Sequence, residues 1–128
     1  MSIEECYQLM GGDYGQVLSR LMSPKLVSRF LAKFPEDKSY EDLESALAEG
    51  RVTDAFRAAH TLKGVCQSLG LGTLLASAQV MTDLLRGQTC EIPEQAMGCF
   101  EGVQNDYAIT VDAIRSYLDS CTQDRPRA

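Results

Sequence analysis

Apolar residues recur at spacings of three and four along most of this 128-residue chain. The longest such run consists of Phe100, Val103, Tyr107, Val111, Ile114, Leu118 and Cys121. This spacing places side chains on one face of an α-helix, whereas a half-buried strand would alternate strictly between apolar and polar residues. Because no stretch of the chain shows that alternation, the pattern predicts an all-α protein.

Glycine and proline divide the chain into several amphipathic segments, each with its own apolar stripe. Ser39 and Thr53 are expected to cap the helices that follow them, and Pro93 to open the longest helix. Amphipathic helices joined by short loops can bury their apolar faces only against one another. We therefore expect an antiparallel four-helix bundle over residues 24–121, with additional short helices in residues 1–23 packed on it and a frayed polar tail over 122–128.

The charge balance excludes some partners. A net charge of -6 argues against a general nucleic-acid binder, which would carry an excess of basic residues. No apolar run approaches the ~20 residues that a membrane span requires. The first residues are acidic where a signal peptide would be basic, so we expect a cytoplasmic protein without membrane contact.

The five cysteines are widely spread and form no C-x-x-C pair, and the chain has one histidine. A zinc site would need closer ligand spacing and usually more histidine. We expect the cysteines to be reduced, mostly buried apolar residues, and we expect no metal site.

The single histidine, His60, lies in the segment AAHTLKGVCQSLGLG of residues 58–72. At about 100° per residue, the apolar residues of this helix fall on an arc opposite His60. They are Ala55, Ala59, Leu62, Cys66 and Leu69, with Ala58 and Val65 at the edges. His60 is therefore predicted to face outward, together with Phe56, Lys63, Gly64 and Gln67 and with Arg57 on the other flank.

This outward patch favours a phosphoryl acceptor. The imidazole of His60 is a nucleophile, and Lys63, three residues on, can neutralise a phosphoryl group as a mobile point charge. Gln67 offers amide donors to the same oxygens. Gly64 weakens the helix by roughly 0.5–1 kcal/mol relative to alanine but leaves the imidazole uncrowded. A hydrolase is poorly supported, because Cys66 belongs to the buried arc and no G-x-S-x-G or P-loop motif occurs.

The string AHTLKG of residues 59–64, followed by Leu69-Gly70, resembles the histidine-containing phosphotransfer (HPt) domain family, and the likeness extends over roughly residues 24–86. The resemblance implies a four-helix bundle that carries phosphoryl groups without kinase activity, cofactor or metal of its own. It implies His60 as phosphoacceptor, Lys63 as the stabilising cation and Gly64 as the position that clears space for a partner.

The resemblance also implies the partners. They would be receiver domains of response regulators, which supply Mg²⁺, and a histidine kinase, including hybrid kinases. Gly64, Gln67, Phe56 and Arg57 would form the face on which the receiver docks. In such bundles a side chain of the next helix often orients the imidazole, and of Gln79, Thr82 and Asp83 we expect Thr82 in that role.

One alternative is a helical interaction module that docks a partner without being phosphorylated. A small hydrolase or metalloprotein is a third option, for which the sequence offers neither a triad nor a ligand set. A monomer is the simplest expectation. The cognate kinase and receiver, the direction of phosphoryl flow, the stimulus and the presence of further domains stay open.

Overall fold

The computed structural model of the protein describes residues 1–123. Its helices are α1 (Ile3–Leu9), α2 (Tyr14–Leu21), α3 (Pro24–Lys33), a 3₁₀ turn η1 (Phe34–Glu36), α4 (Ser39–Ala48), α5 (Val52–Leu69), α6 (Gly72–Leu85) and α7 (Ala96–Gln123). No strand occurs within these residues, which confirms the all-α prediction. Helix α7 includes the first two residues of the predicted tail, and the rest of that tail lies outside the described residues.

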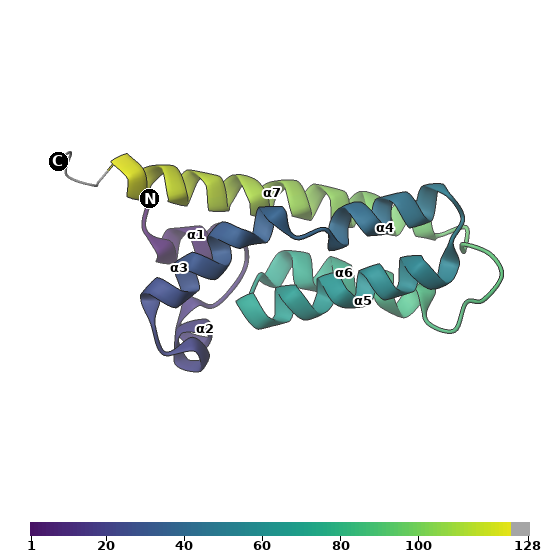
Figure 1. Ribbon diagram of the computed structural model, residues 1–128, viewed down its shortest axis with the longest axis horizontal. Coiled ribbons are helices and arrows are strands. Elements are labelled where there is room, and N and C mark those ends of the chain that lie inside the picture. Colours follow the sequence, from purple (N-terminus) through teal and green to yellow (C-terminus); the bar gives the residue numbers. More distant parts are fainter. Residues whose placement is uncertain (124–128) are drawn as a thin grey trace.

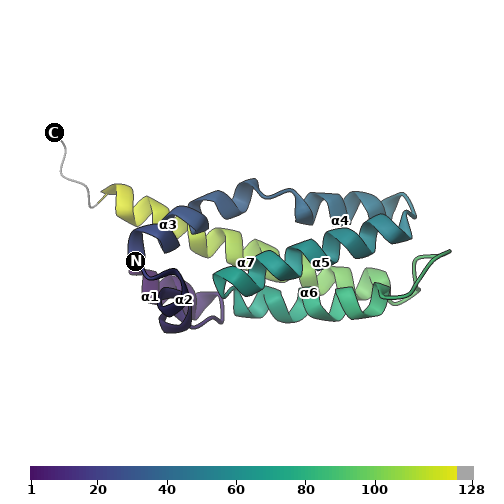
Figure 2. The same cartoon turned by 60° about the horizontal axis from the view of Figure 1, so that its bottom comes forward.

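The four-helix bundle is also confirmed. Helices α4, α5 and α6 follow one another as antiparallel neighbours, and α7 packs on α6 and runs along the whole molecule (Figure 1). Helices α3 and α4 lie roughly end to end and together form one side of the bundle (Figure 2). The interruption between them falls at Pro35, which cannot continue a helix regularly.

Aromatic rings join both sides of this interruption to α7. The ring of Phe34, in η1, lies 5.9 Å from that of Tyr107 between centroids. The ring of Tyr40, in α4, stacks on Tyr107 at 3.9 Å and lies 5.7 Å from Phe100. The first side of the bundle therefore stays in place on α7 although its helix is broken.

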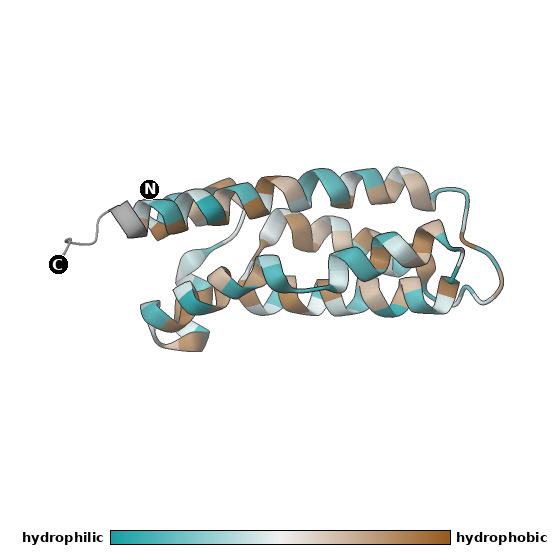
Figure 3. Cartoon of the chain, turned by 45° about the horizontal axis from the view of Figure 1, so that its top comes forward, coloured by the Kyte–Doolittle hydropathy of each residue, from teal (hydrophilic) through white to brown (hydrophobic). Residues whose placement is uncertain are grey.

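The N-terminal helices share the core of the bundle. Helix α1 packs on α7, and its fully buried Cys6 and Tyr7 belong to the same apolar cluster as Ile114 of α7. The hydroxyl of Tyr7 donates a hydrogen bond of 2.7 Å to the carbonyl of Leu69, at the end of α5. Figure 3 shows the apolar and polar segments alternating along the helices, as amphipathic packing requires.

Three predicted helix starts were wrong. Ser39 is already inside α4, and its backbone N–H donates a hydrogen bond of 2.9 Å to the carboxylate of Asp37. Helix α5 begins before Thr53, at Val52, with no side-chain cap, while Arg51 bridges the carboxylates of Glu49 and Asp54. Residue type alone therefore did not predict these two starts: a carboxylate bonds the first N–H of α4, and α5 has no side-chain cap.

The third wrong start concerns Pro93. Its carbonyl accepts a hydrogen bond from the N–H of Ala96 in a turn, and α7 begins only at Ala96. Proline therefore precedes the longest helix rather than opening it.

Candidate functional site

Helix α5 carries the only histidine on its exposed side. Its buried residues are Val52, Ala55, Ala58, Ala59, Leu62, Cys66 and Leu69, whereas His60 is exposed. The helical phase predicted from the sequence is therefore confirmed. The helix ends at Gly70, whose φ of +68° is a left-handed conformation that glycine adopts without strain.

His60 lies in a shallow hollow of about 400 Å³ at the first half of α5. The predicted neighbours Phe56 and Arg57 line it, and the ring of Phe56 lies 6.0 Å from the imidazole between centroids. Thr53, Thr61 and Arg86 complete the lining. Within residues 1–123 no hydrogen bond from a side chain holds the imidazole, and the ring of Phe56 is the aromatic group beside it.

Arg86 belongs to this hollow and was missed by sequence reasoning. It follows the last residue of α6, and its guanidinium carbon lies 5.6 Å from the centroid of the Phe56 ring, a cation–π arrangement. Asp83 also holds it, at 3.5 Å between Nη2 and Oδ1. The only local signal was the i,i+3 spacing of Asp83 and Arg86; the approach to α5 depends on how the two helices pack.

Lys63 and Gln67 line a second hollow, of about 380 Å³, between α5 and α6. Gln79 of α6 lines it from the other side, and its amide donates a hydrogen bond of 2.9 Å to Asp83. The predicted patch is thus divided: Phe56, Arg57 and His60 share one hollow, and Lys63 and Gln67 share its neighbour.

The structure does not bring Thr82 to the imidazole. Its side chain is fully buried, and its hydroxyl donates a hydrogen bond of 2.7 Å to the carbonyl of Ala78 in its own helix. His60 is exposed, so the prediction that Thr82 orients the ring is wrong. The reason is the rotation of α6 about its axis, which points Thr82 into the core and leaves Gln79 and Asp83 nearer the surface.

Gly64 lies one helical turn after His60 in open space. A Cβ built on it would meet no atom within 4 Å outside its own helix backbone. Packing inside the chain therefore does not require glycine at this position. Gly64 lines a third groove, between α5 and the α3 side of the bundle.

The thiol of Cys66 is unsuited to act as a nucleophile with His60. It is fully buried, and burial raises its pKa from an ordinary value near 9 to about 12. The thiol therefore stays protonated near neutral pH, and it lies on the opposite side of α5 from His60.

The described residues bring together no group of three or more histidine, cysteine, aspartate or glutamate side chains able to bind a metal ion. None of the helices in residues 1–123 combines the length and apolar character needed to cross a membrane.

A sequence model described as the Hpt domain matches residues 25–121, which is more than half of the chain. Neither the curated proteins nor the solved structures include a significant match. The matched range contains α4 to α6 and also Arg86 just after α6, and so includes every residue that lines the two hollows beside His60 and Lys63.

Proposed function

The chain belongs to the Hpt domain family, which implies histidine phosphotransfer in two-component relays, and on that premise we propose that it carries a phosphoryl group on His60. The observation that carries the proposal is the position of the chain's single imidazole. It is exposed on α5, with cationic side chains along the same surface. Only His60 can accept the group if the phosphorylated residue is a histidine.

The transfer step needs little covalent chemistry from this chain. A lone pair on a ring nitrogen of neutral His60 attacks the phosphorus of an aspartyl phosphate on a receiver domain. The nitrogen–phosphorus bond forms while the phosphorus–oxygen bond to the aspartate breaks, and the carboxylate leaves with that electron pair. The reverse step passes the group to the aspartate of another receiver. Such a reaction is governed by positioning and by neutralisation of the phosphoryl oxygens.

Cationic side chains that could neutralise the phosphoryl oxygens lie in two places near His60. Lys63 lies one turn along α5 from His60, and its flexible side chain can follow the phosphoryl group as a point charge. Arg57 and Arg86 line the hollow of the imidazole itself. Arg57 is 3.7 Å from Asp54, and Arg86 is 3.5 Å from Asp83, so each has a carboxylate partner in the unphosphorylated chain. Lys63 has no such ion pair within the described residues. It can therefore bind the phosphoryl oxygens without breaking a contact with a carboxylate.

Phe56 and Gln67 have supporting roles in the proposal. The ring of Phe56 limits the movement of the imidazole on one side and holds Arg86 on the other. The amide of Gln67 shares a hollow with Lys63 and can donate to phosphoryl oxygens. The partners would be receiver domains, which supply Mg²⁺ and the acidic pocket, and a histidine kinase that feeds the relay. The chain itself would have no kinase activity.

Transfer from a phosphorylated receiver tests the proposal. Purified chain is incubated with each of a set of receiver domains loaded from radiolabelled acetyl phosphate. We expect label on the wild type that is labile in acid and stable in alkali, as phosphohistidine is, and none on His60→Gln. Equal labelling of His60→Gln would exclude His60 as acceptor, and absence of label on the wild type would favour an interaction module that is not phosphorylated.

A further inference from the structure

Two arginines line the hollow of the imidazole, and each is paired with a carboxylate that does not line it. Nη1 of Arg57 lies 3.7 Å from Oδ1 of Asp54, and Nη2 of Arg86 lies 3.5 Å from Oδ1 of Asp83. The lining consists of His60, the two arginines, Thr53, Phe56 and Thr61. In the part of the chain that the structure describes, the two acids therefore hold positive charge at the edge of this hollow, and no carboxylate lines it.

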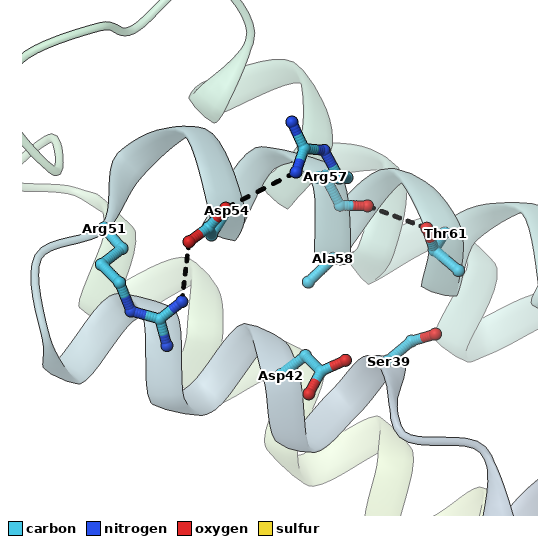
Figure 4. Close-up of a pocket in the computed structure, with 7 residues that line it drawn as sticks. All are labelled: Ser39, Asp42, Arg51, Asp54, Arg57, Ala58 and Thr61. Carbon is cyan, nitrogen blue, oxygen red and sulfur yellow. Dashed lines mark hydrogen bonds and ion pairs between the residues drawn. The ribbon is translucent and has the colours of Figure 1, made fainter.

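Each of the two carboxylates has a second and closer partner. Oδ2 of Asp54 lies 2.8 Å from Nη1 of Arg51, on the surface between α4 and α5 (Figure 4). Oδ1 of Asp83 accepts a hydrogen bond of 2.9 Å from the amide of Gln79, one turn earlier in α6. Neither Arg51 nor Gln79 lines the hollow of the imidazole. A carboxylate that lost its arginine from the hollow would therefore keep a hydrogen bond, which lowers the cost of separating the pair.

The two ion pairs are weak enough to exchange. Their four side chains are between 46% and 74% exposed, and an ion pair between exposed side chains contributes little to stability. A phosphoryl group on His60 would bring about two negative charges and three acceptor oxygens. A guanidinium can bind such a group through two parallel hydrogen bonds. The phosphoryl group would therefore be a stronger partner than an exposed carboxylate at 3.5 Å or more.

The position of Arg86 keeps its guanidinium near the site. Its backbone N–H donates a hydrogen bond of 3.0 Å to the carbonyl of Thr82, which closes the last turn of α6. Its guanidinium carbon lies 5.6 Å from the centre of the Phe56 ring, and the imidazole of His60 lies 6.0 Å from the same centre. Rotation of the arginine side chain past this ring can therefore bring its charge toward His60 while the helix stays in place.

We propose that both ion pairs exchange partners when His60 is phosphorylated: the two arginines move from their carboxylates to the phosphoryl oxygens. Asp54 and Asp83 are then positioning residues, because they act on the phosphoryl group only through Arg57 and Arg86. Each carboxylate competes with the phosphoryl group for its arginine and so shortens the lifetime of the phosphohistidine. This inference rests on the proposed phosphotransfer at His60.

The lifetime of the phosphoprotein tests the exchange without a receiver. Phosphoramidate transfers its phosphoryl group to an imidazole with release of ammonia, and the decay of the label is followed after the reagent is removed. Wild type, Asp83→Asn, Arg86→Ala and the double variant form a cycle that isolates the coupling between the two side chains. Asp42→Asn is the matched control, because Asp42 is exposed on the surface beside Arg57 but forms no ion pair within residues 1–123 (Figure 4).

We expect Asp83→Asn to lengthen the lifetime about threefold, which is within the range of one exposed ion pair, and Asp42→Asn to match wild type. In the Arg86→Ala background, Asp83→Asn should have no further effect, because the carboxylate acts through the arginine. An unchanged lifetime in Asp83→Asn would overturn the proposal. Equal lengthening in both backgrounds would also overturn it, since Asp83 would then repel the phosphoryl group directly.

NMR signals of the arginine Nε–H groups follow the exchange itself. In ¹⁵N-labelled chain, phosphorylation should shift the signals of Arg57 and Arg86 and leave that of Arg51, which stays on Asp54, in place. Substitution of each arginine by lysine assigns its signal. An unchanged signal at Arg57 or Arg86 would overturn the exchange at that residue and leave phosphotransfer at His60 standing. If His60 takes a phosphoryl group from neither phosphoramidate nor any receiver, both proposals fail.

Discussion

At the scale of single residues, helical periodicity determines whether some residues of the site are exposed. Packing between helices determines which side chains surround the others. His60 is exposed and Cys66 is buried because residues on opposite sides of one helix have opposite surroundings. Lys63 and Arg86 both offer a positive charge near the imidazole, but from different helices and with different partners. Arg86 is held between Asp83 and the Phe56 ring, whereas the structure assigns Lys63 no such anchor within residues 1–123.

This difference predicts unequal effects of removing each charge. Lys63→Ala should lower the rate of transfer and shorten the lifetime of the phosphohistidine, by about tenfold, because a charge-assisted contact contributes ~1.5–3 kcal/mol. Arg86→Ala should have a smaller effect on lifetime, since its charge is shared with Asp83. Quenched-flow transfer and the decay of isolated phosphoprotein measure both quantities. Identical behaviour of Lys63→Ala and wild type would remove Lys63 from the mechanism.

At the scale of helices, the C-terminal end of α5 is completed by the N-terminal segment. The guanidinium of Arg20 donates hydrogen bonds to the carbonyls of Gln67 and Ser68, at 3.1 and 3.3 Å. Tyr7 donates to the carbonyl of Leu69. These are among the last four carbonyls of α5, which have no partner within a helix. The added helices α1 and α2 therefore supply the polar partners that the end of the phosphoacceptor helix needs.

Glycines allow this contact. A Cβ on Gly72 would lie 2.0 Å from the carbonyl oxygen of Gly11, and a Cβ on Gly12 would lie 2.0 Å from that of Gly70. Both obstacles are backbone atoms, which cannot rotate away as a side chain does. The turn between α5 and α6 and the turn between α1 and α2 thus approach each other through backbone atoms.

Alanine substitution should distinguish this contact from ordinary helical glycine. We expect Gly72→Ala to lower the free energy of unfolding by about 1–3 kcal/mol, because the two turns must move apart. Gly98→Ala is the matched control, since Gly98 lies within α7 with nothing within 4 Å of its Cβ. That change should be neutral or stabilise by up to ~1 kcal/mol through helix propensity. Urea unfolding monitored by circular dichroism gives both values, and equal effects would show that the close approach is not a constraint.

At the scale of the whole molecule, one apolar core extends from Cys6 in α1 to Tyr117 in α7. The core contains the thiols of Cys6 and Cys66 and the ring of Tyr7. Burial raises the pKa of Cys6 to about 11 and that of Cys66 to about 12, and it also raises the pKa of Tyr7. The folded protein therefore keeps protons in alkali that the unfolded chain would lose.

Stability should consequently fall as the pH rises above 9. Between pH 9 and about 12 the thiol of Cys66 is protonated in the folded state and ionised in the unfolded state. The unfolded state then binds fewer protons, so the free energy of unfolding decreases, by at most ~1.4 kcal/mol per pH unit for this group. Urea unfolding in reducing buffer at pH 8, 9.5 and 10.5 should show a shallower decline for Cys66→Ala than for wild type. The exposed Cys90 is the control, because Cys90→Ser should keep the wild-type slope, and equal slopes for all three would refute the role of burial.

The sequence by itself determined the helical class, the four-helix bundle and the outward direction of His60. These follow from the spacing of apolar residues, because the geometry of one helix fixes which side chains share a face. The same local reasoning placed Phe56 and Arg57 beside His60, and the structure lines one hollow with all three. It failed for the caps at Ser39 and Thr53: the carboxylate of Asp37 accepts a hydrogen bond from the first N–H of α4, and α5 begins without a side-chain cap.

Only the tertiary structure decided what the neighbouring helices present to α5. The rotation of α6 buried Thr82 and left Gln79 beside Lys63, and the end of α6 brought Arg86 to Phe56. The groove that Gly64 lines likewise requires α3 to meet α5, because Phe30 and Gly64 line it together although they lie 34 residues apart in the chain. Such contacts depend on how rigid helices rotate and fit against one another, and spacing within a single helix carries no information about that fit.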